Sequence, residues 1–290
     1  MKLYIKSLLP AAALALSLGL SSCVGDLDVK PIDPKTNMTV NPDNLFNKCY
    51  ANMAVAGNGG ANGDSDVDGI DGGTSGFLRQ LFNSQELTSD EAISAWGDEG
   101  VQPLNKNQWN SEHPFLRGFY YRLFFGVTVC NHYLEVAKNH DATMTAEVRF
   151  LRALYYYYLM DGWGNIGFRT TVGSDKPAQM SRADLYKWIE SEVLEAEKNM
   201  AEAKPEKDTE AGYGRADKAA AWLLLSRLYL NAEVYTGKAE WEKAKKYAKM
   251  VMDSSYKLHT GKAVNGWTAY QQLFMGDNGE NGASVEAIFP

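Results

Sequence analysis

Histidine and cysteine are scarce in this sequence, which limits the metal and redox chemistry available to it. The 290 residues include four histidines and three cysteines, and no two cysteines form a CxxC pair. The histidines are His113, His132, His140 and His259. Because they are widely scattered, they do not suggest a ligand set. We therefore expect no metal centre built from histidine and cysteine, and no motif indicates another cofactor.

Common catalytic motifs are also missing. The sequence has no GxSxG elbow, no HExxH helix and no Walker loop. One enzyme class stays open, a glycoside hydrolase that uses two carboxylates. Its candidate residues are Glu86, Asp90, Glu91, Asp98 and Glu99. Acidic residues at this density usually form a solvated face, so we predict no catalytic residue and favour a binding function.

The sequence contains fewer basic than acidic residues. Lysine and arginine total 29 against 36 aspartates and glutamates, a formal net charge of -7. Nucleic-acid-binding proteins need a basic surface, so a nucleic-acid partner is not expected. The composition, 45% hydrophobic and 22% charged, is that of a globular protein with enough apolar residues for a sizeable core.

The first 22 residues read as a lipoprotein signal peptide. Lys2 and Lys6 precede an apolar run, residues 8–20, that is too short to span a bilayer as a helix. The run ends in Leu-Ser-Ser-Cys, a lipobox that predicts cleavage before Cys23 and lipidation of its thiol. Several acyl chains give stable anchoring. A plain secretory signal with an incidental cysteine is the alternative.

Residues 23–40 form a tether rich in proline and aspartate, and residues 41–290 form the folded region. Asn41 is predicted to cap a helix that Gly57 closes. Cys49 on that helix and Cys130 further along occupy apolar helical positions. Cysteine in such a stripe behaves as a small hydrophobe, so we expect two free buried thiols.

A glycine-rich loop follows between residues 57 and 76. It holds eight glycines and four aspartates, Asp64, Asp66, Asp68 and Asp71. So long a loop in a folded domain is either mobile or a binding loop. The spacing from Asp64 to Gly69 begins like a calcium loop, but Ser75 stands where the bidentate glutamate is required. Whether the loop binds calcium stays open.

Helical periodicity dominates the rest of the chain. Apolar residues recur by three and four from Leu116 to Ala137, in residues 185–200 after a capping box at Ser181, and from Ala221 onward after a predicted cap at Asp217. The last two predicted helices form a pair of about tetratricopeptide length. The predicted fold is therefore all-α dominated, a scaffold of tetratricopeptide-like helix pairs with long irregular loops.

One helix and its exit carry a family resemblance. Residues 149–168 read RFLRALYYYYLMDGWGNIGF, with Leu151, Leu154, Tyr155 and Tyr158 on one apolar face and glycines expected to stop the helix from Gly162 onward, leaving Trp163 in an irregular exit. The positions that match a known signature are Glu147, Phe150, Leu151, Arg152, Ala153, Tyr156, Leu159, Gly164, Asn165 and Ile166. In them the chain resembles the SusD/RagB family of surface glycan-binding lipoproteins of Bacteroidota. It departs at Gly167, where the family usually has proline.

The resemblance implies a location and partners. Such lipoproteins lie on the outer face of the outer membrane, held by a lipid anchor, and the acidic Asp26 and Asp28 resemble their export signal. They bind oligosaccharides or polysaccharides and cover a TonB-dependent, SusC-like transporter. An alternative function is a lid for an importer of other nutrients, such as peptides. The glycan and the transporter stay unidentified at this point.

The resemblance also implies binding residues. Starch-binding members place an aspartate in the glycine-rich loop, an arginine eight residues later and a stacking tryptophan seventeen residues beyond that. Asp71, Arg79 and Trp96 fit this spacing. Glu99 stands where those members have asparagine. A core tryptophan and a surface ion pair are the alternative interpretation of Trp96 and Arg79.

The chain resembles only the N-terminal half of that family. Its final residues, 284–289, read as the start of a strand with no partner. We therefore expect a truncated chain whose unpaired strand favours association.

Overall fold

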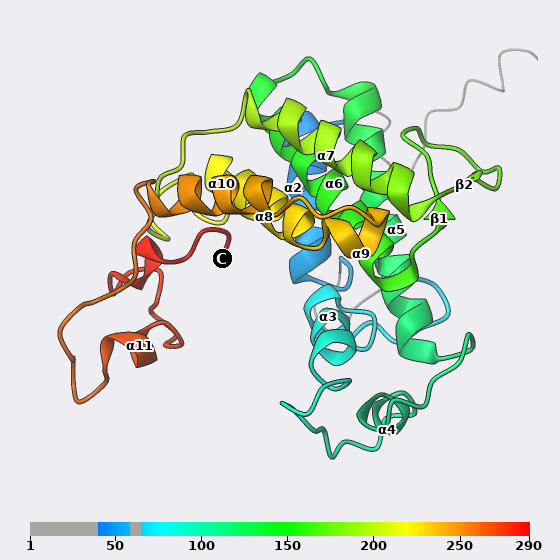
Figure 1. Ribbon diagram of the computed structural model, residues 1–290, viewed down its shortest axis with the longest axis horizontal. Helices are drawn as coiled ribbons and strands as arrows, with labels where there is room; N and C mark the ends of the chain where they lie inside the picture. The colour runs from blue at the N-terminus through cyan, green and yellow to red at the C-terminus, as the bar shows by residue number, and fades with distance from the viewer. Residues whose placement is uncertain (1–39, 59–64) are drawn as a thin grey trace, which may run out of the picture. The chain divides into compact units, whose positions relative to one another are not determined.

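Helices account for nearly all of the regular structure between Asn41 and Pro290. The computed structural model describes residues 40–58 and 65–290. The helices are α2 (Pro42–Ala54), α3 (Phe77–Gln85), α4 (Val101–Asn105), α5 (Pro114–Val136), α6 (Ala142–Trp163), α7 (Arg182–Glu197), α8 (Lys218–Leu230), α9 (Ala232–Thr236), α10 (Trp241–Met252) and α11 (Ala269–Gln272) (Figure 1). The predicted helix-dominated fold class is confirmed.

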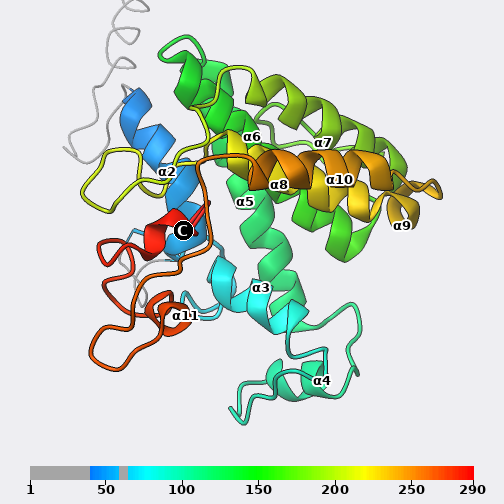
Figure 2. The same ribbon diagram turned by 60° about the vertical axis from the view of Figure 1, so that its left-hand side comes forward.

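The long helices pack mainly on their neighbours along the chain. Helix α2 packs on α5, α5 on α6, α6 on α7, α7 on α8, and α8 on α10. Figure 2 shows α8 and α10 running alongside each other. Antiparallel helix pairs that stack in this order form the expected scaffold.

Helix α6 lies within this stack, and most residues of its middle part, 146–160, are buried. Leu151, Leu154 and Tyr155 are buried, as their spacing predicts, whereas Tyr158, the fourth member of that face, is half-buried. The residues between them are buried too, because α5 and α7 both pack against α6. The buried set is Ala146, Glu147, Val148, Phe150, Leu151, Arg152, Ala153, Leu154, Tyr155, Tyr156, Tyr157, Leu159 and Met160. The buried surface of α6 is therefore wider than the single apolar face that the periodicity predicts.

The exit from α6 differs from the prediction. The helix continues through Gly162 and Trp163 and ends at Gly164, whose φ of 73° favours glycine. Trp163 is therefore the last helical residue. Its ring packs against Phe119 at 6.0 Å and Tyr120 at 5.3 Å between ring centres.

Two charged signature positions are buried anchors. Glu147 accepts a hydrogen bond from the Tyr50 hydroxyl at 2.5 Å and pairs with Arg215. Arg152 donates to Glu192 on α7 at 2.5 Å. Removing one member of such a pair would leave a buried charge without its partner, which is strongly destabilising. These two signature residues therefore hold α6 against neighbouring segments of the chain.

Side-chain caps begin three of the predicted helices. Asn41 accepts from the Asn44 amide at 3.0 Å, Ser181 caps α7 and Asp217 caps α8. The first helix ends at Ala54, three residues before the predicted stop at Gly57, because Val55 is already extended.

The two predicted free thiols are confirmed. Cys49 and Cys130 are fully buried and unbridged. Burial raises the pKa of the Cys130 thiol well above its usual value. These thiols therefore belong to the packed core.

Strands contribute little to the described residues. Strand β1 (Ile166–Gly167) pairs antiparallel with β2 (Gln179–Met180), with Ile166 opposite Met180. The strand predicted over residues 284–289 is wrong. The segment forms the short 3₁₀ helix η2 (Ala283–Val285), and Phe289 packs 6.1 Å from the rings of Tyr50 and Phe150.

Candidate functional site

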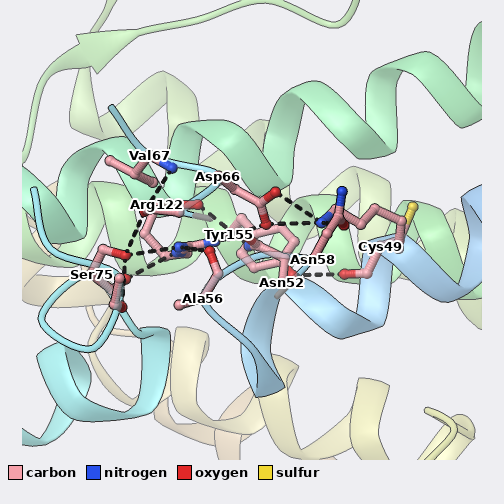
Figure 3. Close-up of polar contacts among 12 residues, drawn as sticks. Cys49, Asn52, Ala56, Asn58, Asp66, Val67, Ser75, Arg122 and Tyr155 are labelled. Atoms are coloured by element: carbon pink, nitrogen blue, oxygen red, sulfur yellow. Dashed lines mark hydrogen bonds and ion pairs between the residues drawn. The ribbon is translucent and has the colours of Figure 1, made fainter. Parts of the chain in front are cut away.

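Arg122, on α5, ties the loop between α2 and α3 to the helices (Figure 3). Its side chain is completely buried. The guanidinium donates to the backbone oxygens of Ala56 and Ser75 at 2.6 and 2.9 Å, and to the Ser75 hydroxyl at 3.0 Å. It also donates to the Asn52 side chain at 3.1 Å and lies 3.4 Å from Asp66. One side chain therefore holds both ends of the loop.

Opposite charges within this cluster stabilise one another. Burial lowers the pKa of Arg122, and the neighbouring Asp66 carboxylate opposes that shift. Lys48 donates to the same carboxylate at 2.9 Å. Two cationic side chains thus contact the Asp66 carboxylate, so its oxygens are poorly placed to bind a metal ion.

The calcium interpretation of this loop gains no support. Asp64, its first residue, lies outside the described residues. The Asp68 carboxylate accepts from the Gly69 amide at 2.8 Å, and Asp71 caps a turn instead. No group of three or more metal-binding side chains occurs among residues 40–58 and 65–290.

The anchored loop leads directly into α3, whose first turn carries Arg79. The Arg79 guanidinium lies 5.7 Å from the ring centre of Trp96 and 5.6 Å from that of Phe115. It pairs with Asp98 and donates to the Gly73 carbonyl at 3.4 Å. Arg79 therefore connects the glycine-rich loop to the segment that carries Trp96.

Trp96 is exposed over 67% of its surface, so it is not a core residue. The segment around it is supported by a small separate core of Leu87, Val101, Leu104 and Phe115. A side chain at Gly100 would collide with the Phe115 ring, because a β-carbon there would lie 2.6 Å from it. This packing presents the indole to solvent on a supported segment.

His113 joins this segment to α5. It is buried, its Nε2 lies 3.0 Å from the Gly100 carbonyl, and its Nδ1 accepts from the Leu116 amide at 3.4 Å. This pattern fits a neutral ring with the proton on Nε2. Burial lowers the pKa of His113 from its usual 6.5, while the Gly100 carbonyl and Glu99 act in the opposite direction.

Asp71 and Glu99, the other two predicted binding residues, are both exposed. Asp71 accepts from the Thr74 amide at 3.0 Å and from the Thr74 hydroxyl at 3.3 Å. Within the part of the chain that the structure describes, neither carboxylate bonds to Arg79. The structure thus brings Arg79 and Trp96 into contact and leaves Asp71 and Glu99 on the flanking segments.

Two neighbours of Arg79, Asp98 and Phe115, are absent from the predicted binding set. Asp98 stands two residues after Trp96, and its sequence position suggests only a hydrolase carboxylate. Phe115 lies 36 positions beyond Arg79, and no local pattern connects the two. Only the tertiary fold reveals that both surround the same guanidinium.

Comparison with known proteins identifies a family that this chain matches. A SusD-like family model, described as "Starch-binding associating with outer membrane", matches residues 27–230. The starch-binding protein SusD of Bacteroides thetaiotaomicron is 41% identical over 294 residues, covering 99% of this chain and 51% of that protein. The chain therefore spans about half the length of this curated relative.

Solved structures share the fold at lower identity. A SusD-like protein from Bacteroides fragilis has a TM-score of 0.61 at 20% identity, covering 88% of this chain and 46% of that one. Surface glycan-binding protein A from Bacteroides uniformis has a TM-score of 0.59 at 18% identity, covering 84% and 51%. These similarities support the helical scaffold.

Proposed function

The chain belongs to the SusD-like family of starch-binding proteins that associate with the outer membrane, and we propose that it captures glycans at the cell surface without cleaving them. The observation that carries this proposal is the exposed Trp96 ring held beside the Arg79 guanidinium. Because the relative from Bacteroides thetaiotaomicron is a starch-binding protein, starch and maltooligosaccharides are the first ligands to test.

The chemistry of the site suits a sugar. A sugar ring offers an apolar face framed by hydroxyl groups, so its receptor needs a flat exposed aromatic and polar groups beside it. Trp96 supplies the aromatic surface, and Arg79 supplies donors next to it. Asp71 and Glu99 complete the proposed set as hydrogen-bond acceptors at the edges.

Binding without hydrolysis follows from the setting of the carboxylates. A glycosidase needs one carboxylic acid in an environment that keeps it protonated and a second across the bond that is cleaved. Of the five candidate acids, Asp90, Glu91, Asp98 and Glu99 are exposed and Glu86 is half-buried, and Asp98 pairs with Arg79. This arrangement favours a solvated face around a binding site.

The proposal includes a lipid anchor at Cys23 and delivery of the glycan to a TonB-dependent, SusC-like transporter. Cys23 and residues 1–22 lie outside the described residues. None of the helices in residues 40–58 and 65–290 combines the length and apolar character that a membrane crossing requires. Lipidation at the lipobox would provide the membrane attachment that the family description implies.

A binding panel tests the proposal. The purified full chain and its Trp96→Ala variant are incubated with insoluble starch, soluble starch and unrelated polysaccharides, and retained protein is measured. Retention of the wild type on at least one glycan, reduced in the variant, supports capture. Released reducing ends would favour a hydrolase. Retention by no glycan would favour the alternative, a lid for an importer of other nutrients.

A further inference from the structure

A second hollow surface runs along the N-terminal half of α5, away from Arg79. Three neighbouring cavities, of about 190, 780 and 530 Å³, share their walls. Trp109 and Trp163 line the first two, while Tyr120, Asn165 and Ile166 line the second and third. Because neighbouring cavities share these lining residues, they form one groove that passes from the region before α5 to strand β1. Single ligand sites typically occupy about 300–1,000 Å³.

Aromatic side chains line this groove at different depths. Trp109 is 45% exposed and Tyr121 is 48% exposed, so both present ring surface to solvent. Trp163 is half-buried, and its contacts with Phe119 and Tyr120 fix its orientation. Rigid aromatic surfaces in a row provide stacking positions for successive rings of a ligand.

The polar groups of the groove carry no excess charge. Its charged residues are two acids, Glu112 and Asp161, and two bases, Arg117 and Lys176. An anionic ligand would require an excess of positive charge. The balance instead suits a neutral ligand that both donates and accepts hydrogen bonds.

Asn165 supplies a preorganised donor in the same groove. Its side-chain oxygen accepts from the Arg182 amide at 2.8 Å, and its backbone oxygen accepts from Gln179 at 3.2 Å. The side-chain nitrogen has no acceptor among the described residues. Since the amide is already oriented, a ligand hydroxyl could bind this nitrogen at little ordering cost.

We propose that this groove is a second binding site for a neutral oligosaccharide. The inference rests on the proposed function for the class of ligand, and it adds a site that shares no residue with Asp71, Arg79, Trp96 and Glu99. Trp109 and Tyr121 would stack on sugar rings, and Asn165 and Arg117 would bind hydroxyls. The adjacent residues Phe115 and Leu116 separate the two sites, because Phe115 contacts Arg79 while Leu116 lines the groove.

Titration calorimetry with maltoheptaose tests the inference on the full chain. The proteins compared are the wild type, Trp96→Ala, the double variant Trp109→Ala/Tyr121→Ala, and the combination of all three changes. Trp241→Ala is the matched control, because Trp241 is 60% exposed on α10 and lines neither site. Thermal unfolding of each variant shows whether the fold is intact.

We expect the wild type to bind more than one maltoheptaose and each site variant to weaken one of these binding events. The combined variant should show no binding, and the control should match the wild type. Loss of all binding in Trp96→Ala, with the double variant unchanged, would overturn the groove site and leave the proposed function intact. Loss of all binding in the double variant, with Trp96→Ala unchanged, would support the groove site and show that Trp96 does not bind the glycan. Absence of binding by the wild type would overturn both.

Discussion

Arg79 holds its guanidinium carbon 5.7 Å from the ring centre of Trp96, within the range of a cation–π contact. The ring nevertheless keeps 67% of its surface exposed. Asp98, two residues after Trp96, pairs with the same guanidinium and restrains it further. A sugar that stacks on Trp96 would therefore meet a ring and a donor that are already oriented, which lowers the entropic cost of binding.

Trp96→Ala should weaken glycan binding without loss of fold. An aromatic anchor of this kind contributes about 1–3 kcal/mol. The corresponding loss of affinity is roughly 5- to 150-fold, measured by titration with maltoheptaose. Trp241→Ala, at a similarly exposed tryptophan on α10, should bind as the wild type does. Equal affinity in Trp96→Ala would make Trp96 irrelevant to the sugar.

Arg122→Met should destabilise the protein and release the glycine-rich loop. The change leaves the buried oxygens of Ala56 and Ser75 without their donor and removes a charge opposite Asp66. We expect the free energy of unfolding to fall by about 3–5 kcal/mol in urea denaturation. Lys245→Met, at an exposed basic residue of α10, serves as the control. An unfolding midpoint equal to that of the control would contradict this role.

Leu225→Ala tests the packing of α8. Leu225 is fully buried in the main core, whereas Leu230 at the end of the same helix is 62% exposed. Loss of apolar burial and the cavity left behind should cost about 2–5 kcal/mol. Leu230→Ala should change the melting temperature little. If both variants melt alike, α8 does not pack as described.

Stability should decline in acid through His113. Its pKa in the folded protein is below the usual 6.5, so in the interval beneath 6.5 the unfolded chain binds more protons than the folded chain. The contribution of this group is therefore complete above 6.5 and is lost as the pH falls through that interval. Urea unfolding between about pH 5 and pH 8 measures it.

The variant His113→Asn keeps a helix-capping side chain and removes the titration. Its unfolding free energy should depend less on pH than that of the wild type below 6.5. His140→Asn, at an exposed histidine, is the matched control. A pH profile of His113→Asn that parallels the wild type would assign the acid sensitivity to another group.

Cys23→Ala tests the lipid anchor. Cys23 is the only residue of the lipobox that can carry the lipid, so the substitution should move the protein from the membrane fraction to the soluble fraction. Immunoblots of fractionated cells measure this change. Undiminished membrane association would rule out lipid attachment at Cys23 as the anchor.

Helix positions follow closely from the sequence because capping residues and apolar spacing are local signals. Asn41, Ser181 and Asp217 all cap helices as predicted. The extent of burial on α6 does not follow, since its neighbours α5 and α7 decide how many faces are covered. The strand prediction for residues 284–289 fails for a similar reason, because Phe289 packs against core aromatics and needs no strand partner.

The candidate site is only partly readable from the sequence. The spacing of Arg79 and Trp96 matches a family pattern, and the structure brings these two residues together. The contact of Phe115 with Arg79 depends on how α5 packs on α3, which no local pattern encodes. The groove along α5 cannot be predicted either, because Trp109 and Trp163 come to line one cavity only in the folded chain.

The two backbone contacts of Arg122 determine which changes in loop length the protein can tolerate. The guanidinium holds the chain at Ala56 and again at Ser75, immediately before the helix that carries Arg79. A change of length between these two clamped positions would leave the start of α3 in place. Insertions and deletions there would alter the loop while Arg79 and Trp96 keep their positions. One buried arginine thus allows this loop to vary in length without disturbing the helical scaffold.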